Sequence, residues 1–181
     1  MTKYIKLWES WTREEDSHDW LSDLGFQAPN RFDRDGYRTG AWEYYWENGD
    51  LKSKGQYLNG ERTGPWRWYY ENGALEYKGQ YMNDLKTGPW EEWSDSGTLS
   101  CKGHYLHGKR TGPWEYYWEN GALGSKGNYL DGKDTGPWEF YWETGALREK
   151  GQYLNGLRAG TWKEYARSGN LISTKNYRAE G

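Results

Sequence analysis

The chain has 181 residues and a formal net charge of −3, and hydrophobic residues make up only 34% of it. It contains 14 Trp and 17 Tyr beside 25 Gly, so its core is expected to be aromatic rather than aliphatic. This aromatic content argues against a disordered chain. The near-neutral charge disfavours nucleic acid and anionic lipid as partners, because both reward a basic surface.

No targeting or membrane-spanning segment is evident. Residues 1–11 carry no apolar run of signal-peptide length, and no segment approaches the ~20 apolar residues of a transmembrane helix. A single cysteine, Cys101, leaves no intramolecular disulfide to form. We therefore expect a cytoplasmic protein without stable membrane insertion.

The N-terminal segment, residues 1–38, precedes the regular part of the chain. The run Thr12-Arg13-Glu14-Glu15 has the pattern of a capping box, which predicts a short helix from about Arg13 to Leu24. Between Glu9 and Asp23, six acids stand against one Arg, so this segment would steer a basic partner. We expect it to cap the first sheet edge, and residues 31–38 to form the second half of a degenerate repeat.

From Thr39 onward the chain repeats with a period of 24 residues. With positions counted 1 to 24 in each repeat, Gly recurs at 2, Trp at 4, an aromatic at 7, Gly at 11, Leu at 13 and Tyr at 19. Such a period indicates a repeat architecture. The predicted domain of six repeats covers residues 39–62, 63–86, 87–110, 111–134, 135–158 and 159–181.

Each repeat is predicted to be a β-hairpin. Positions 3–9 and 13–20 form its strands. Pro at position 3 suits the first residue of a strand, where a missing N–H donor costs little. Asn-Gly at positions 10 and 11, as in Asn48-Gly49, predicts a two-residue turn between them. A second turn at positions 21 and 22 leads to the next hairpin. The fold class is therefore all-β: an elongated, single-layer antiparallel meander of twelve strands, with a short N-terminal α-helical cap.

The predicted turn fixes which positions face each other: 9 and 12, 8 and 13, 6 and 15, 5 and 16, 4 and 17. Trp114 then faces Gly127, and its ring would cover that glycine. Glu at position 5 faces Lys at 16, as in Glu43 and Lys54. One face would carry positions 4, 6, 8, 13, 15 and 19, and the other the charged pairs. The expected core is Trp at 4, the aromatic at 7, Leu at 13 and Tyr at 19.

This pattern resembles the MORN repeat variant family. The residues that carry the resemblance in one repeat are Trp42, Tyr45, Asn48, Gly49, Leu51, Gly55, Tyr57, Gly60 and Gly64. Its local departures are Asp84, Trp93, Ser96 and Lys175. The resemblance implies a hairpin array that binds proteins, since bacterial members are often antitoxin components and related proteins are scaffolds or membrane-associated modules. We expect a protein-binding module of the antitoxin or immunity type.

Positions 6 and 8 are the candidate partner-binding positions, because their residues vary. They hold Tyr44, Trp46, Trp68, Tyr70, Tyr116, Trp118, Phe140 and Trp142. If the sheet has no second layer, these rings form an exposed aromatic surface of the kind that marks interactions. If curvature or the N-terminal segment covers them, they belong to the core.

The third repeat departs from this pattern, with Glu92 and Ser94 at positions 6 and 8. By the predicted pairing Glu92 faces Cys101. A carboxylate among rings suits a cation, either a Lys or Arg side chain or a quaternary amine. The alternative is neutral variation within one repeat.

No catalytic, cofactor or metal site is expected. Cys101 and His104 differ in parity and point to opposite faces of a strand, which argues against a metal site or a Cys–His pair. The predicted function is a non-catalytic protein–protein interaction module that occludes a toxin or effector. The alternatives are binding of carbohydrate, cell wall or a small cation by the aromatic face, and a membrane-surface scaffold. Open sheet edges would allow a homodimer.

Overall fold

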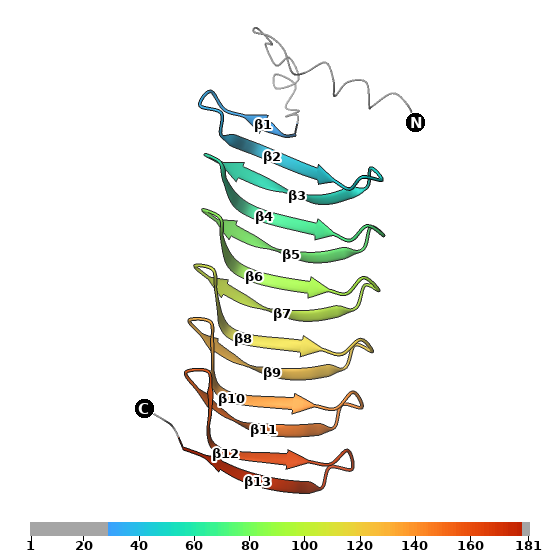
Figure 1. Ribbon diagram of the computed structural model, residues 1–181, viewed down its shortest axis with the longest axis vertical. Helices are drawn as coiled ribbons and strands as arrows, with labels where there is room; N and C mark the ends of the chain where they lie inside the picture. Colours follow the sequence, from blue (N-terminus) through green and yellow to red (C-terminus); the bar gives the residue numbers. More distant parts are fainter. Residues whose placement is uncertain (1–28, 179–181) are drawn as a thin grey trace.

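The protein is described over residues 29–178 by a computed structural model, and this part of the chain forms one open antiparallel sheet (Figure 1). Thirteen strands follow each other in sequence order, each hydrogen-bonded to its neighbours. They are β1 (Arg31–Phe32), β2 (Arg38–Tyr45), β3 (Leu51–Leu58), β4 (Glu61–Tyr69), β5 (Leu75–Met82), β6 (Leu85–Trp93), β7 (Leu99–Leu106), β8 (Lys109–Tyr117), β9 (Leu123–Leu130), β10 (Lys133–Tyr141), β11 (Leu147–Leu154), β12 (Leu157–Tyr165) and β13 (Leu171–Tyr177).

The all-β hairpin meander predicted from the sequence is confirmed for residues 29–178, which contain no helix. One strand more than the predicted twelve is present, because the short strand β1 pairs with β2. The helix predicted over Arg13–Leu24 lies outside the described residues.

The first turn of each hairpin differs from the prediction, whereas the second lies at positions 21 and 22 as predicted. After β2, the Trp46 N–H donates to the Asp50 carbonyl and the Gly49 N–H donates to the Trp46 carbonyl. Only Gly49 has a positive φ, of 90°, so residues 47–49 form a three-residue loop with glycine in the left-handed region. The predicted second turn is a two-residue turn with two left-handed residues, Asn59 (φ 52°) and Gly60 (φ 83°). The predicted two-residue turn at positions 10 and 11 is therefore wrong.

A bulge in the return strand compensates for the longer loop. Tyr44 pairs with Ser53, but Tyr45 pairs with Leu51, so Lys52 has no residue opposite it. The pairings predicted for positions 4, 5 and 6 occur, and those predicted for 8 and 9 do not. Directly opposed residues share a face, so Leu51 joins Tyr45 on the face opposite to Trp42. The aromatic at 7 and Leu at 13 were wrongly placed in the tryptophan core, and Tyr45 is 54% exposed.

Each hairpin is joined to the one before it by a tryptophan that covers a glycine. The tryptophan row consists of the position 4 residues Trp42, Trp66, Trp90, Trp114, Trp138 and Trp162. A Cβ added to Gly55 would lie 2.0 Å from a ring atom of Trp66, and the same overlap recurs between each later strand glycine and the next tryptophan. The prediction that Trp114 covers its register partner Gly127 is wrong: Trp114 covers Gly103, and Trp138 covers Gly127.

The backbone bends to bring each ring over the preceding strand. In β4, Thr63 pairs with Gln56 and Arg67 with Lys54, so residues 64–66 lie opposite a single residue of β3. Gly64 supplies the left-handed φ of 62° that this bend requires. Pro65 has no N–H to leave unpaired, so it is tolerated in the bulge. Pro at position 3 thus lies inside the strand. The prediction that it is the strand's first residue is wrong.

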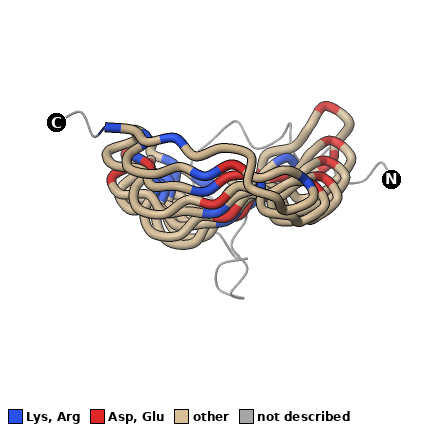
Figure 2. The backbone as a smooth tube through the Cα atoms, turned by 90° about the horizontal axis from the view of Figure 1, so that it is seen from below, with Lys and Arg blue, Asp and Glu red and all other residues tan. Residues whose placement is uncertain are grey.

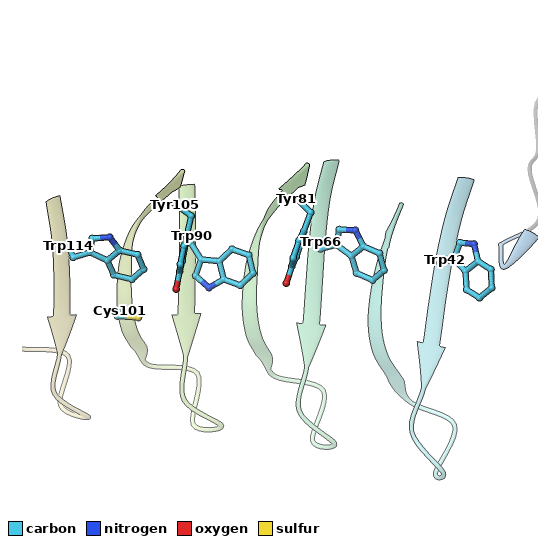
Figure 3. Packing of buried hydrophobic residues seen from close by; sticks show 7 residues of the cluster. All are labelled: Trp42, Trp66, Tyr81, Trp90, Cys101, Tyr105 and Trp114. Atoms are coloured by element: carbon cyan, nitrogen blue, oxygen red, sulfur yellow. The ribbon is translucent and has the colours of Figure 1, made fainter. Parts of the chain in front are cut away.

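The rings form a continuous row along the sheet, and this row is the core. Each tryptophan meets the position 19 tyrosines on both sides edge to face, at centroid distances of 5.0–6.3 Å and interplanar angles of 72–90°. Phe32 takes the place of a tyrosine beside Trp42 at the start of the row. Figure 3 shows the part from Trp42 to Trp114, where Trp66, Trp90 and Trp114 are each 1% exposed.

Seen along the stack, the basic positions and the acidic positions of successive hairpins superpose in rows (Figure 2). By strand alternation, the residues at positions 5 and 16 lie on the face opposite to the tryptophan row. Glu43 and Lys54 are register partners, as predicted. The ion pairs, however, join adjacent hairpins rather than the two strands of one: Lys78–Glu91 at 2.9 Å, Lys102–Glu115 at 2.8 Å and Lys126–Glu139 at 3.0 Å. Exposed pairs of this kind contribute little each, about 0.2–1 kcal/mol.

Both ends of the described sheet carry features that oppose further strand addition. At β2, the Asn30 side chain accepts from the Glu43 N–H at 2.8 Å and donates to the Glu43 carbonyl at 3.0 Å, so it takes the place of a strand's peptide group. At β13, Lys175 stands where the other hairpins have the covered glycine, and a charged residue there opposes edge pairing. A homodimer through the sheet edges stays a prediction, and these two features weigh against it.

We predict that Gly103→Ala lowers the free energy of unfolding by about 3 kcal/mol, because its Cβ would lie 2.2 Å from the Trp114 ring. Urea denaturation followed by tryptophan fluorescence measures this change. Lys175→Ala is the matched control, since no hairpin within residues 29–178 follows β13 to place a ring over that equivalent position. Its effect should stay within about 0.5 kcal/mol. Equal losses in the two variants would contradict the covered-glycine contact.

Candidate functional site: the aromatic face

The eight rings predicted at positions 6 and 8 lie beside the tryptophan row and are here called the ring stripe: Tyr44, Trp46, Trp68, Tyr70, Tyr116, Trp118, Phe140 and Trp142. Position 6 rings contact the row directly, as Trp68 stacks on Trp66 at 5.3 Å. The Arg148 guanidinium lies over both Phe140 and Trp142, so positions 6 and 8 adjoin. All eight residues are partly buried.

The position 6 rings are held in place by their neighbours. The Tyr44 and Tyr57 hydroxyls are 3.2 Å apart, and the Tyr116 and Tyr129 hydroxyls 3.0 Å apart. Burial raises the pKa of Tyr44 to about 12 and raises that of Tyr116 as well, so both phenols are neutral hydrogen-bonding groups at physiological pH. Trp68 has no such partner and stacks on Tyr77 at 4.4 Å instead.

The position 8 rings bind the next hairpin through hydrogen bonds to its backbone. The indole N–H of Trp46 donates to the Tyr69 carbonyl at 3.1 Å, and the Tyr70 hydroxyl donates to the Trp93 carbonyl at 2.9 Å. Trp118 and Trp142 repeat this bond 23 residues along the chain. Rings that are fixed before a partner arrives lose little conformational entropy on binding. Residues 29–178 form one sheet and supply no second layer over them.

Glu92 faces Cys101 as predicted, but it already has partners within the chain. Its carboxylate accepts from the Trp90 indole N–H at 3.0 Å and from the Cys101 thiol at 3.6 Å. Four other indoles of the tryptophan row donate to a position 18 carbonyl of the preceding hairpin instead. The Trp90 indole is accordingly turned over relative to its neighbours (Figure 3).

The cation that Glu92 was predicted to attract also has a counterpart within the chain. Lys86 lies 3.9 Å from the centroid of Trp90, where burial lowers its pKa and the charge of Glu92 opposes that change. An external cation at Glu92 would compete with Lys86. The third hairpin is thus an internally satisfied variant of the repeat, and binding of a ligand at Glu92 stays a prediction.

A row of cations on this face was missed by the sequence reasoning. Position 24 holds Arg38, Arg62, Lys86, Arg110 and Arg158, which we call the cation row. Each lies 3.9–5.1 Å from a tryptophan centroid of the row or, for Arg62, 4.2 Å from Tyr81. The signal was present in the sequence as a basic residue recurring before five of the six repeats. The one equivalent place without a cation, before the fifth repeat, holds Asp134.

A row of exposed aliphatic side chains at the inter-hairpin turns was also missed. Its members at position 20 are Leu58, Met82, Leu106, Leu130 and Leu154, each 48–61% exposed, and Leu85 and Leu157 adjoin them at 47% and 61%. By strand alternation they lie on the face of the charged pairs, opposite to the ring stripe. We call them the aliphatic row.

No group of three or more His, Cys, Asp or Glu within residues 29–178 is arranged to hold a metal ion. His104 pairs with Pro89 and Cys101 with Glu92, three residues apart on β7, so their side chains leave the sheet on opposite faces. The same span contains no helix with the length and hydropathy needed to cross a bilayer.

Comparison with protein families finds the model described as MORN repeat variant. It matches residues 38–59, 62–83, 110–131, 134–155 and 158–179, which together exceed half of the chain. The matched segments leave out residues 84–109, which contain Glu92, Ser94 and Cys101.

No curated protein matches the chain. Among solved structures, a chain in "Crystal structure of GtfA/B complex bound to UDP and GlcNAc" is similar at 12% identity and a TM-score of 0.24. The similarity covers 59% of this chain and 21% of that chain, so this chain spans about one fifth of the solved one.

The thiol of Cys101 is predicted to resist alkylation in the folded protein. Burial, reinforced by the charge of Glu92, raises its pKa to about 12, so the reactive thiolate is scarce at pH 8. Iodoacetamide labelling followed by mass spectrometry should be at least a hundredfold slower in buffer than in 8 M urea. Comparable rates in the two solutions would contradict the burial of Cys101.

Proposed function

The chain belongs to the MORN repeat variant family, and on that premise we propose that it is a non-catalytic module that binds a protein partner through the ring stripe. Proteins with MORN repeats generally bind proteins or membranes. The observation that supports a protein partner here is the ring stripe itself: eight rings, fixed by hydrogen bonds and stacking, on a sheet whose described part has no second layer. Trp and Tyr are the residues that most often dominate protein interfaces.

The partner that this proposal names is a toxin or effector protein in the cytoplasm, whose active surface the sheet occludes. Occlusion suits the geometry, because the face of a long open sheet can cover a surface without entering a cleft. The module needs no cofactor for this role. A shallow hollow of about 340 Å³ lies between the first two hairpins and could accommodate a protruding side chain of the partner. Its lining includes Tyr44, Lys52, Tyr57 and Trp68.

The test is affinity capture from host lysate with the wild type and with Trp46→Ala/Trp118→Ala. Both replaced rings belong to the ring stripe and end in hydrogen bonds at the hairpin loops, so their loss should spare the tryptophan row. We expect one protein captured stoichiometrically by the wild type, with at least a tenfold weaker Kd for the double variant, since two interface rings each contribute about 1 kcal/mol or more.

The matched control is Tyr45→Ala/Tyr117→Ala, which removes rings of the same two hairpins from the opposite face. It should capture the partner as the wild type does. Equal loss in both double variants, with circular dichroism unchanged, would contradict binding by the ring stripe. Retention on insoluble polysaccharide without any captured protein would favour the carbohydrate alternative.

Association with a membrane surface is a second candidate, and the aliphatic row favours it. Its exposed side chains follow the inter-hairpin turns along the sheet, with Lys109 and Lys133 beside them. Apolar residues flanked by lysines suit the interface of an anionic bilayer. Leu106→Ser/Leu130→Ser should lower co-sedimentation with phosphatidylserine vesicles several-fold, whereas Trp46→Ala/Trp118→Ala should not. No sedimentation of the wild type would exclude this candidate.

A further inference from the structure

The cation row is interrupted once, in front of the fifth hairpin. Asp134 pairs with Tyr129 across β9 and β10 in the same way that Arg110 pairs with Tyr105. At the other five places the cation lies over the tryptophan or the position 19 tyrosine of the hairpin that it precedes. Within residues 29–178, no Lys or Arg lies over the Trp138 or Tyr153 ring of the fifth hairpin. Arg158 is the register partner of Tyr153, but its guanidinium lies over Trp162.

The acid at this place is not neutralised by a neighbouring side chain. No Lys or Arg among the described residues comes within ion-pair distance of Asp134. Arg158, the next member of the cation row, is held by both carboxylate oxygens of Glu149 at 2.6 and 2.8 Å. Arg110, the preceding member, lies over Trp114 and reaches the Tyr129 hydroxyl at 3.4 Å. Within residues 29–178, Asp134 therefore has no cation as an ion-pair partner, and its register partner is Tyr129.

We propose that Asp134, Tyr129 and Tyr153, above the Trp138 ring, form a site for an arginine or lysine side chain of the protein partner. This inference rests on the proposed function, since the ligand is part of a protein. The other five copies of this arrangement are the precedent: the scaffold holds a cation wherever the chain supplies one. Before the fifth hairpin, the chain has the anion Asp134 in place of the cation, and the partner would contribute the cation.

The site is accessible to such a side chain. Asp134, Tyr129 and Tyr153 are each partly exposed, whereas Trp138 is 3% exposed and lies at the base. Four of the five cations in the row are arginines, so the scaffold suits a guanidinium, whose plane stacks on a ring while its N–H groups reach a carboxylate. We therefore expect arginine to bind more tightly than lysine.

The experiment is an NMR titration of the full chain with the tripeptide acetyl-Gly-Arg-Gly-amide, followed at the indole N–H of Trp138 and the rings of Tyr129 and Tyr153. Saturable shifts are expected at millimolar peptide. They should weaken with the Lys tripeptide and be absent with the Glu tripeptide. Asp134→Asn should raise the Kd about fivefold, because it removes one exposed charge of the pair.

The repeats themselves provide the decisive variant. Asp134→Arg restores the cation row, so it should fold at least as stably as the wild type and should abolish the shifts. Asp131→Asn, which removes a charge from the adjacent turn, should leave them unchanged. No shift in the wild type, or equal shifts in Asp134→Arg, would overturn the site.

The failure of this proposal is distinguishable from failure of the proposed function. If Asp134→Arg captures the protein partner as tightly as the wild type, the cation site is wrong and the ring stripe stands. If the tripeptide binds as expected but lysate yields no protein, the site stands and the protein-binding function is wrong.

Discussion

The packing of each tryptophan ring on a glycine of the preceding strand is the contact on which the rest of this sheet depends. A two-stranded hairpin is at best marginally stable alone, and a single-layer sheet has no second layer to bury its apolar face. The ring crosses from one hairpin to the previous one and supplies that burial within the layer. Only glycine leaves the space, as a Cβ at Gly79 would lie 1.8 Å from Trp90. The left-handed glycine two residues before each tryptophan produces the bend that directs the ring, and in four of the six repeats a proline lies between them.

Several features of the surface follow from this contact. Because the core is confined to one row of rings, the residues on either side of it are free to differ between repeats. Position 6 and 8 rings pack against the row and remain partly exposed, and the basic residues at position 24 cover it. Lys175 is consistent with the same constraint, since it lies in β13, the last strand of the described sheet, where no further described hairpin places a tryptophan over it. The array is thus a fixed scaffold with a variable aromatic face.

Much of this was predictable from the period of the sequence. The strands, the antiparallel order and the opposition of Trp42 to Gly55 or Glu43 to Lys54 follow from the repeat and its turn residues. The type of the first turn did not follow, because Asn-Gly suits both a two-residue turn and the end of a three-residue loop. That ambiguity also hid the bulge at Lys52, and with it the transfer of Tyr45 and Leu51 to the charged face.

The direction of the tryptophan rings and the partners of Glu92 were not accessible to pattern reasoning. The strand register determines which residue lies opposite Trp114. The backbone bend before Trp114 determines which of the two neighbouring strands its ring covers. Glu92 was identified as unusual, yet its bonds to Trp90 and Cys101 depend on an indole that turns over. The cation row and the break at Asp134 were visible as a periodic basic residue, and became meaningful only once the rings beneath them were placed.

The most direct test of the central contact is a double-mutant cycle on Gly127, which has Trp114 as its register partner and Trp138 as its covering ring. The free energy of unfolding would be measured for Gly127→Ala alone, with Trp138→Ala, and with Trp114→Ala. The account predicts that Gly127→Ala costs about 3 kcal/mol in the wild type and with Trp114→Ala, and almost nothing with Trp138→Ala. Relief of the cost by Trp114→Ala, with none from Trp138→Ala, would show that each ring covers its own hairpin and would contradict the account.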